Sequence, residues 1–381
     1  MTSPPRVLIA YSYSMHYRLG VFRALLEASE ADVTIAVGET VAAHAAQLVQ
    51  PIDPAELPEM QVHRTQAWRS LRWQPTLLRE SLSPRYDVVI WDPSLHCLTM
   101  WASSVLLRAR GRTLLYWGLG WTRSHGRVKE QAKVWGFRLA HAFLTYGHRS
   151  RQRAVAAGYP ADRLYVVGNS IVDTPQAAVV AREEMLPAQP LVLGTSVRLS
   201  ARKRVDLLIE AAAVLQRSGT AVRVRIVGDG PERAGLEHLA ARRGVEVDFL
   251  GPLYEPDAIA DFYRSIHLTV LPGHAGLTVL QSLMHGRPVV THDDPDHHAA
   301  EWEALEDGVT GAFFPPGDVA ELVAAIQTVA GWVRTRNASL REACRAAYLA
   351  VGSPAAHAHR VLDAASHTTN HRKNRQAAEQ E

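Results

Sequence analysis

Residues 266–284 read IHLTVLPGHAGLTVLQSLM, and this stretch contains every part of a strand–turn–helix unit. An apolar run that ends at Leu271 predicts a buried β-strand, and Leu277–Met284 has the pattern of a short helix. Gly273 and Gly276 stand in the turn, where they allow a ligand to approach the main chain. The N–H groups and the dipole at a helix start favour an anion. The stretch predicts an α/β fold with a phosphate at this turn, and the alternative is a plain turn whose glycines serve the backbone.

The same alternation of short β-rich runs and amphipathic helices continues along both halves of the chain. It predicts two doubly wound parallel sheets. The expected strands of the first half are Val7–Tyr11, Val33–Val37, Val88–Trp91, Thr113–Trp117, Ala142–Thr145 and Leu164–Val167. Those of the second half are Leu191–Ser196, Val222–Val227, Val247–Leu250, Leu268–Leu271 and Pro288–Thr291.

The domain boundaries follow from composition. We expect an N-terminal Rossmann-like domain at 1–173, a proline-flanked linker at 174–190 and a C-terminal domain at 191–350. A C-terminal helix at 351–366 is expected to pack back on the first domain. Residues 367–381 are polar without an apolar period, so we expect a disordered tail.

Charge is unevenly distributed in a chain of ordinary globular composition. The net charge is only +3, but residues 1–175 carry 20 Lys and Arg against 13 Asp and Glu, and residues 108–153 carry 11 against Glu130 alone. This favours an anionic partner or surface, with a merely solvated basic face as the alternative. Two distant cysteines indicate a reducing compartment, and neither a signal peptide nor a run of about 20 apolar residues is present. We therefore expect a cytoplasmic protein.

Several polar residues follow predicted strands, at the edge where open α/β sheets bind ligands. Arg198 and Lys203 follow the strand Leu191–Ser196, and two cations there can neutralise a diphosphate; ordinary surface cations of a loop are the alternative. In the first domain, His16 and Gly20 lie in the loop after Val7–Tyr11. This histidine is either a titratable functional group or a structural residue.

The stretch HDDPDHH at 292–298 contains metal-binding residue types, but its spacing does not dictate a tetrahedral site. We expect no metal, with His292 and Asp293 lining the sugar end of a cleft. Glu301 and Glu303 either reach a sugar or lie on a helix surface. A dehydrogenase is disfavoured because no strand end has GxGxxG with a following acid.

Taken in order, five blocks of the second half resemble the donor-nucleotide domain of retaining glycosyltransferases with the GT-B fold, family 4 (glycosyltransferase group 1). The blocks are VRLSARKRVDLLIEA, RIVGDGPER, VDFLGPLYEPDAIADFYRSIHLTVLPG, GLTVLQSLMHGRPVVTH and EDGVTGAFFPPGD, and they cover about 190–330. The first half is similar more loosely to a subgroup acting in polysaccharide and glycolipid assembly. Its matching blocks are MHYRLGVFRALLE, LLYWGLGWTRS and LYVVGNSIVDT.

The resemblance implies a GT-B fold, in which two Rossmann-like doubly wound domains face an interdomain cleft. It also implies metal-independent transfer of a sugar, with retention, from a nucleotide sugar and without another cofactor. Arg198 and Lys203 would hold the donor diphosphate, and Gly20 would let the first domain close over it beside His16 as a catalytic candidate. Gly251, Leu253 and Tyr254 would meet the nucleobase, and Gln281 would face the ribose. Ala275, Gly276, Leu277 and Thr278 would cradle the phosphates by main-chain N–H groups, and Thr278 could add its hydroxyl.

Two positions depart from the family. Its paired glutamates, eight positions apart, fall on Gly273 and Gln281, and the histidine of its Trp-Gly-His-Gly block falls on Leu119. A glutamine amide can still hydrogen-bond a ribose, whereas Gly273 supplies no side chain. Alternatives to an enzyme of cell-surface polysaccharide or glycolipid assembly are therefore a soluble natural-product glycosyltransferase and a nucleotide-sugar-binding protein with weak or no activity.

The basic segment 123–141 bears on the acceptor. Val128, Ala132, Trp135 and Leu139 recur at helical spacing beside cationic residues. Such a helix either docks on an anionic membrane surface or packs this apolar stripe into its own domain. Docking would suit a lipid-linked acceptor and a peripheral location at the inner face of the plasma membrane, and a small-molecule hydroxyl acceptor remains open. Nothing in the sequence indicates nucleic acid.

Overall fold

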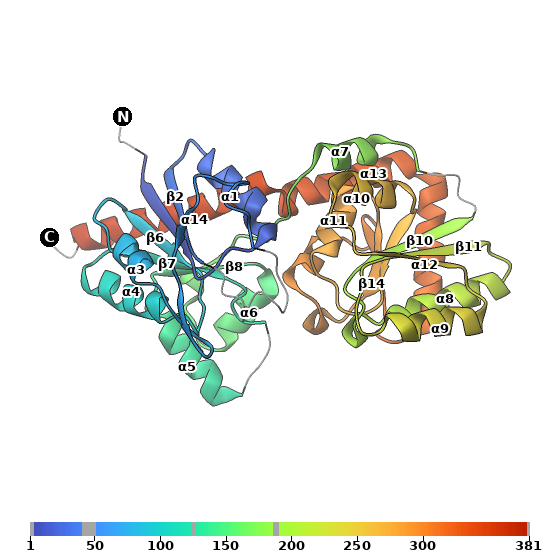
Figure 1. Ribbon diagram of the computed structural model, residues 1–381, viewed down its shortest axis with the longest axis horizontal. Helices are drawn as coiled ribbons and strands as arrows, with labels where there is room; N and C mark the ends of the chain where they lie inside the picture. Colours follow the sequence, from blue (N-terminus) through green and yellow to red (C-terminus); the bar gives the residue numbers. More distant parts are fainter. Residues whose placement is uncertain (1–3, 40–50, 123–125, 186–189, 379–381) are drawn as a thin grey trace. The chain divides into compact units, whose positions relative to one another are not determined.

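The computed structural model describes residues 4–39, 51–122, 126–185 and 190–378. The chain divides into two compact units, which Figure 1 shows with the sequence coloured from blue to red. Unit 1 comprises Met1–Val172 together with Ser353–Glu381, and unit 2 comprises Asp173–Gly352. The interdomain cleft stays a prediction.

Unit 1 is built on a parallel sheet of seven strands. From edge to edge the strands are β3 (Gln61–His63), β2 (Asp32–Gly38), β1 (Arg6–Tyr11), β6 (Val88–Trp91), β7 (Thr113–Gly118), β8 (Ala142–Thr145) and β9 (Leu164–Val166). Every residue of β6, β7 and β8 is buried, as expected when helices cover both faces of a parallel sheet. A small antiparallel hairpin, β4 (Gln66–Trp68) and β5 (Leu71–Trp73), was not predicted from the sequence.

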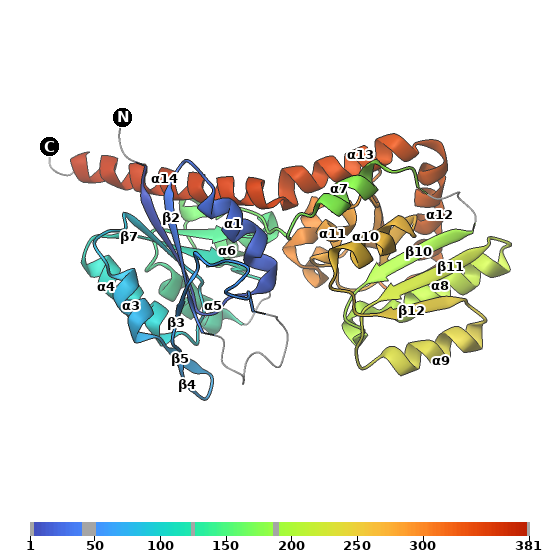
Figure 2. The same cartoon turned by 45° about the horizontal axis from the view of Figure 1, so that its top comes forward.

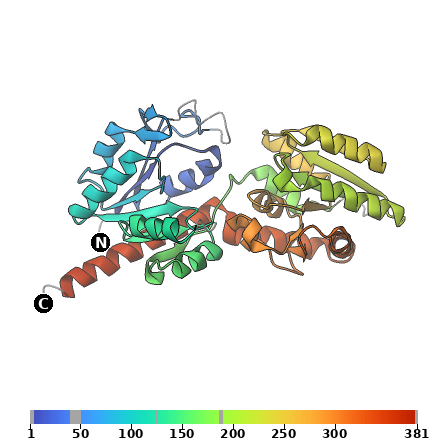
Figure 3. The ribbon, with the colours of Figure 1, turned by 90° about the horizontal axis from the view of Figure 1, so that it is seen from below.

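Two helical layers enclose this sheet. On one face lie α3 (Pro75–Ser81), α4 (Leu98–Ala109), α5 (Arg127–Phe137) and α6 (His148–Ala156), packed on side chains such as Leu8 and Trp91. On the other face lie α1 (Leu19–Leu26) and α14 (Pro354–Ala378), where Phe22 contacts Tyr11 and His357 contacts Trp117. Figure 3 shows α14 in red along its face of the sheet.

The expected disordered tail is wrong for the described residues of 367–381, because α14 continues to Ala378. Its early part is held by buried apolar side chains such as Val361 and Leu362, and it contacts α1, β7 and β8. Its later part is held by polar contacts instead: His367 bonds Tyr165 and Arg372 bonds Thr113. This half of the helix has no periodic apolar pattern, so its sequence did not predict a helix.

Unit 2 repeats the architecture with a six-stranded parallel sheet. Its order is β12 (Val247–Gly251), β11 (Val222–Val227), β10 (Leu191–Ser196), β13 (Leu268–Leu271), β14 (Val289–His292) and β15 (Gly311–Phe314). One layer contains α8 (Val205–Arg217), α9 (Arg233–Arg243) and α12 (Val319–Thr335). The other contains α7 (Pro175–Arg182), α10 (Pro256–Arg264), α11 (Thr278–Met284) and α13 (Asn337–Ala347), as Figure 2 shows.

Local signals explain where several of these helices begin. Asp318 caps α12 by accepting hydrogen bonds from the N–H groups of Ala320 and Glu321. Thr174 caps α7 in the same way, and Pro175 occupies its first turn. The segment expected to be a linker therefore contains a packed helix in its described part, since Val180 of α7 is buried against α10.

Two further observations limit what the chain can do. Among the helices of the described residues, none has the length and apolarity needed to cross a bilayer. Cys97 and Cys344 are free and buried, and burial raises the pKa of each thiol to about 12. Neither cysteine is therefore a reactive thiolate near neutral pH.

Candidate functional site

The centre of the unit 2 sheet is its topological switch point. β10 lies between β11 and β13, so the chain winds outward from β10 in both directions. The loops that leave β10 and β13 diverge there, at the carboxyl ends of the strands. Open α/β sheets bind ligands at this place. Arg198 and Lys203 lie in the first loop, and Ala275, Gly276 and Leu277 lie in the second.

These two loops are joined by hydrogen bonds. The Nζ of Lys203 donates to the His274 carbonyl at 2.7 Å. The N–H groups of Gly273 and His274 donate to the carbonyls of Lys203 and Arg202, each at 3.1 Å. The Thr278 hydroxyl donates to the Ser196 carbonyl at 2.7 Å. The structure thus brings Lys203 together with the start of α11, which were predicted separately from two strand ends.

Gly273 is required by this contact. A Cβ at this position would lie 2.4 Å from the Arg202 carbonyl oxygen and 2.7 Å from the Lys203 carbonyl carbon, both rigid backbone atoms. No glutamate can occupy Gly273 without moving the loop after β10. Gly276 is different, because its added Cβ would meet only the His274 ring at 3.6 Å and the Ala299 Cβ at 3.8 Å.

The N–H groups at this turn divide into one that is engaged and three that are open. The Ala275 N–H donates to His298 Nδ1 at 3.0 Å, so the prediction that it cradles phosphate is wrong for this structure. Within the described part of the chain, the N–H groups of Gly276, Leu277 and Thr278 have no protein acceptor. These three N–H groups are therefore the ones that remain available to bind an anion. The hydroxyl expected from Thr278 is likewise committed, to Ser196.

Lys203 is a cation held in a partly dry place. Burial and, to a smaller extent, the charge of Arg202 lower its pKa to about 8, against an opposing effect of Glu301. His274, whose ring Nδ1 lies 3.3 Å from the Lys203 Nζ, has its pKa lowered to about 3 by burial and by Lys203. The histidine is therefore neutral at physiological pH. A bound anion would restore the stability of the charged lysine.

Arg198 lies in the same loop with an exposed side chain. Its neighbours explain the glycines after β11. A Cβ on Gly228 would lie 1.9 Å from the Val197 carbonyl oxygen, and one on Gly230 would lie 2.2 Å from that of Leu199. The two glycines of the GDG turn therefore leave room for the loop that contains Arg198 to pack against it.

The histidine-rich loop after β14 supports the cradle. The rings of His292 and His298 stack at 3.9 Å, and His298 also stacks on Trp302 at 5.5 Å. His298 Nε2 bonds the His292 carbonyl at 2.8 Å while its Nδ1 accepts from Ala275. Among described residues, no group of three or more His, Cys, Asp or Glu is arranged to hold a metal ion. Sequence reasoning missed His298 as a support because its partner lies on another strand end.

The residues expected to meet a nucleoside lie at and just after the end of β12 and in the middle of α11. Gly251 adopts φ +71° and its carbonyl accepts from the Gly228 N–H at 2.8 Å, which ties its loop to the GDG turn. Leu253 packs on the apolar cluster under α10, while the Tyr254 side chain is 68% exposed. Gln281 is half-buried, and its Oε1 accepts from the Tyr263 hydroxyl at 3.2 Å, so its NH₂ group remains to donate.

The predicted residues of unit 1 also lie at a switch point, because β1 stands between β2 and β6. The His16 ring is partly exposed and lies 3.5 Å from Glu56. Gly20 is buried, and a Cβ there would lie 2.9 Å from Pro354 and 3.1 Å from the Val172 Cα. Packing of α1 against this segment therefore accounts for Gly20 without a ligand.

Sequence reasoning did not assign a role to Arg18, which is completely buried. Its guanidinium lies 4.8 Å from the ring centres of both Trp117 and Tyr146 and bonds Asn169 at 3.3 Å. Leu119, two residues beyond Trp117, is 54% exposed at the end of β7. Arg18 thus fixes the aromatic base of this edge, and Leu119 presents an apolar side chain above it.

Comparison with known proteins finds relatives of the part of the chain that contains these loops. Residues 190–331 match the family model described as Glycosyl transferases group 1. Alpha-D-kanosaminyltransferase of Streptomyces kanamyceticus is 31% identical over 221 residues, which cover 53% of this chain and 55% of that protein. A GDP-mannose-dependent alpha-(1-6)-phosphatidylinositol dimannoside mannosyltransferase of Mycobacterium tuberculosis is 36% identical over 118 residues, 30% of each chain. The match thus spans about half or less of these relatives.

Solved structures resemble the whole chain more distantly. Anabaena Alr3699/HepE in complex with UDP superposes with a TM-score of 0.68 at 18% identity, covering 95% of this chain and 99% of that one. The lipopolysaccharide outer core galactosyltransferase WaaB, in its apo form, also gives a TM-score of 0.68, at 15% identity with 94% and 98% coverage. These likenesses concern the fold.

Proposed function

Because residues 190–331 form a domain of the glycosyl transferases group 1 family, we propose that this chain transfers a sugar from a nucleotide-sugar donor to an acceptor hydroxyl. One observation carries the proposal. At the switch point of unit 2, the Lys203 Nζ is bonded to the His274 carbonyl beside the open N–H groups of Gly276, Leu277 and Thr278. A cation and N–H dipoles on one side are the arrangement that stabilises a departing diphosphate.

The chemistry follows from where charge develops. The bond between the anomeric carbon and the diphosphate oxygen breaks, and its electron pair stays on the oxygen. Lys203, with Arg198 in the same loop, balances the new charge, and this balance is worth most in the transition state. The acceptor oxygen bonds the anomeric carbon on the same face, and its proton passes to the leaving phosphate oxygen. The product retains its anomeric configuration, and no metal is needed.

The nucleoside would lie toward Gly251, Leu253 and Tyr254, with the Gln281 NH₂ group facing the ribose. Anabaena Alr3699/HepE, which has been solved in complex with UDP and with UDP-glucose, supports a uridine nucleotide as the first donor to examine. A thermal-shift panel of UDP, GDP, dTDP and ADP identifies the base, since only the correct nucleotide stabilises the folded protein strongly.

Replacing Lys203 tests the proposal most directly. Lys203 is the single lysine between residues 173 and 352. We expect Lys203→Ala to lower turnover roughly ten- to a thousand-fold, the effect of one lost charge-stabilising donor. Lys373→Ala, an exposed lysine of unit 1, serves as the matched control and should retain activity. Full transfer activity in Lys203→Ala would overturn this assignment.

The acceptor is proposed to be a lipid-linked sugar of cell-surface polysaccharide or glycolipid assembly, with the protein peripheral at the inner face of the plasma membrane. The α5 helix supports this, because Val128 is 84% exposed and Trp135 is 78% exposed. The alternative in which this stripe packs into its own domain is wrong, since α5 packs through Val134 and Phe137 instead. Exposed apolar side chains on a basic segment suit an anionic membrane surface.

A second acceptor class deserves a direct comparison because the kanosaminyltransferase is a relative. A soluble enzyme for a small natural product would share the donor site without needing a membrane. Screening lipid-linked and free acceptors separates the two. The absence of room for a glutamate at Gly273 supports a third candidate, a nucleotide-sugar-binding protein, and tight donor binding without transfer or hydrolysis would favour it.

A further inference from the structure

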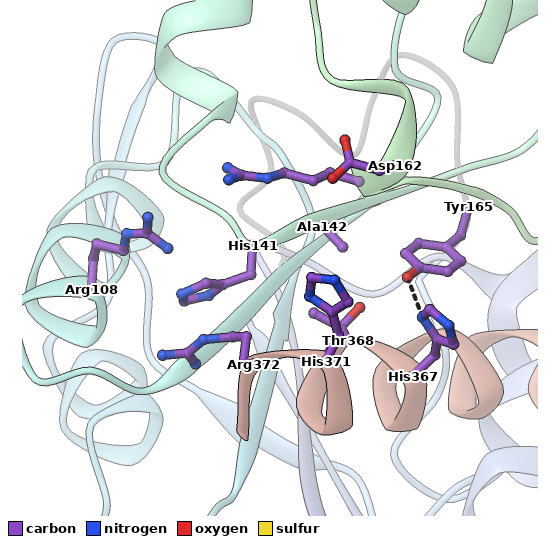
Figure 4. A pocket seen from close by; sticks show the side chains of 10 residues that line it. Arg108, His141, Ala142, Asp162, Tyr165, His367, Thr368, His371 and Arg372 are labelled. Carbon is purple, nitrogen blue, oxygen red and sulfur yellow. Dashed lines mark hydrogen bonds between the residues drawn. The ribbon is translucent and has the colours of Figure 1, made fainter. Parts of the chain in front are cut away.

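Unit 1 contains a cavity of about 670 Å³ at the opposite edge of its sheet, among the amino ends of β7, β8 and β9. We call it the cationic pocket, and its principal lining residues are Arg108, His141, Arg163, Tyr165, His367 and Arg372. They come from α4, from the segments that precede β8 and β9, and from the part of α14 that was expected to be disordered. Figure 4 shows the pocket with His141 between Arg108 and Arg372.

The charges in this pocket are unbalanced. Three arginines face a single carboxylate, Asp162, and two further imidazoles, those of His367 and His371, lie at the rim. Burial lowers the pKa of Arg372, and the nearby Arg108 lowers it further. The pKa of Arg108 is lowered in the same way by burial and by Arg163. The Arg108 guanidinium therefore repels those of Arg163 and Arg372, and an anion bound among them would offset this repulsion.

His141 contributes a neutral donor at the centre. Its Nδ1 accepts a hydrogen bond from the Leu114 N–H at 3.1 Å, so the proton of the neutral ring is on Nε2. Its pKa is lowered to about 3 by burial, with Arg372 and Arg108 as further causes. The ring thus stays neutral near pH 7 and offers an N–H group between two cations.

Part of the pocket is already held in place by hydrogen bonds. Nη1 of Arg372 donates to the Thr113 hydroxyl at 2.8 Å and its Nη2 donates to the Gly111 carbonyl at 3.0 Å. The Tyr165 hydroxyl and His367 Nδ1 are hydrogen-bonded at 2.7 Å. Side chains fixed in advance lose little entropy when a ligand binds. The expected entropic cost of ordering Arg372, Tyr165 and His367 on binding is therefore small.

We propose that the cationic pocket binds the phosphate group of a phosphorylated small molecule, at a site separate from the donor loops of unit 2. Arg108 and Arg163 supply guanidinium forks, which match the oxygens of a phosphate, and His141 in the same pocket supplies an N–H group. The cavity volume lies in the range of small-molecule sites, so it admits more than the phosphate alone.

In the first test, binding of inorganic pyrophosphate to the full chain is measured by calorimetry in phosphate-free buffer. Saturable binding is expected, and its affinity should fall at least about tenfold in the double variant Arg108→Gln with Arg163→Gln, because two charge-assisted contacts are lost. Arg110→Gln is the matched control, since Arg110 ends the same helix without lining the pocket; it should stay within about twofold. A Lys203→Ala background removes the contribution of the donor site.

A melting experiment keeps the test independent of folding defects. Without anion, the double variant should melt at the wild-type temperature or above it, because the repulsion is relieved. It should also lose the stabilisation that pyrophosphate gives the wild type. The proposal is overturned by two results together. Pyrophosphate shows no saturable binding, or binds wild type and the double variant equally; and anionic vesicles also bind wild type and the double variant equally.

A vesicle arm distinguishes a free ligand from a lipid headgroup that carries the same phosphate. Phosphatidylcholine vesicles with and without phosphatidic acid are sedimented with wild type and double variant, each in a Trp135→Ser background. Binding that needs phosphatidic acid and both arginines, without binding of pyrophosphate, assigns the pocket to a headgroup. Pyrophosphate binding that needs both arginines assigns it to a free phosphate compound.

Discussion

Lys203 should make nucleotide binding at the proposed donor site depend on pH. Burial lowers its pKa to about 8, so the free protein loses this proton as the pH rises through that value. A diphosphate binds the charged form better, so its dissociation constant should rise by about tenfold per pH unit above pH 8. The Lys203→Ala variant should bind more weakly at neutral pH and without this slope. Titrations of the nucleoside diphosphate at several pH values check this, and a flat wild-type curve would contradict it.

Alanine substitutions at Gly273 and Gly276 should affect different properties: the first the stability of the fold, the second the binding of the nucleotide. Gly273→Ala should lower the free energy of unfolding by about 1–3 kcal/mol, because its Cβ would overlap the backbone of the Lys203 loop. Gly276→Ala should leave the free energy of unfolding within about 1 kcal/mol of wild type, since its Cβ has ordinary contacts. The same variant should nevertheless weaken donor binding, because the methyl group stands beside the open N–H groups. Chemical denaturation and nucleotide binding, measured on both variants, provide the comparison.

At this scale the sequence predicted which loops would meet but not how their atoms are used. Strand ends locate Lys203 and the start of α11, since parallel strands end on one edge of the sheet. The bond from Ala275 to His298, and that from Thr278 to Ser196, depend on side chains from other loops. No local pattern encodes such pairings. The engaged N–H group could therefore not be told from the open ones.

The helix α5 should bind anionic membranes through its exposed apolar side chains. Replacing both Val128 and Trp135 by serine should reduce co-sedimentation with anionic vesicles several-fold, because their apolar area no longer enters the interface. The thermal midpoint should change little, since both side chains are exposed. A Val134→Ser control, which alters the buried face, should instead lower the midpoint. Vesicle binding that ignores the double substitution would contradict docking through α5.

The orientation of α5 could not be derived from its pattern, because two apolar faces share one helix. Val128 and Trp135 recur at helical spacing, and so do Val134 and Phe137. Packing against Tyr116 and Trp121 selects the second pair. Lys133, a cationic residue of the same helix, donates to the Gly120 carbonyl at 2.6 Å. The late part of α14 was missed for a related reason, since polar contacts to Tyr165 and Thr113 hold it.

Buried histidines make the stability of the whole molecule sensitive to acid. The pKa is lowered to about 3 for His141 and His274 and to about 4 for His285 and His298. In the unfolded chain these rings titrate near 6.5, so the unfolded state gains protons first as the pH falls. Between about pH 6.5 and pH 4 each should cost on the order of 1.4 kcal/mol per pH unit. Thermal midpoints across this range check the trend, and a midpoint that rises on acidification would contradict it.

The two units should differ in their independence. Unit 2 is one continuous segment with its own sheet and core, so residues 173–352 alone should fold and melt cooperatively. Residues 1–172 alone lack α14, whose removal would expose Phe22 and Trp117 to water. That fragment should be unfolded or aggregated. Circular dichroism of both fragments tests this, and a cooperatively folded 1–172 fragment would show that α14 contributes little.

The sheets themselves were predicted well, because buried parallel strands such as β6 and β8 are unbroken apolar runs. Short strands were missed where three residues carry too little pattern, as in β3 and the β4–β5 hairpin. The division of the chain was also harder to predict. The segment 174–190 contains α7, which packs in unit 2. Its composition alone had led to the prediction of a linker there.

The two-part composition of unit 1 has a consequence for biosynthesis. The ribosome makes residues 1–172, then all of unit 2, and only then the helix that covers α1 and the neighbouring strands. The first segment must wait, with an apolar face uncovered, for about 180 further residues at a translation rate of roughly 5–20 per second. Unit 2 therefore matures first although it is made second. We expect the nascent protein to depend on chaperones for roughly 10 to 40 seconds, until α14 covers its first strands.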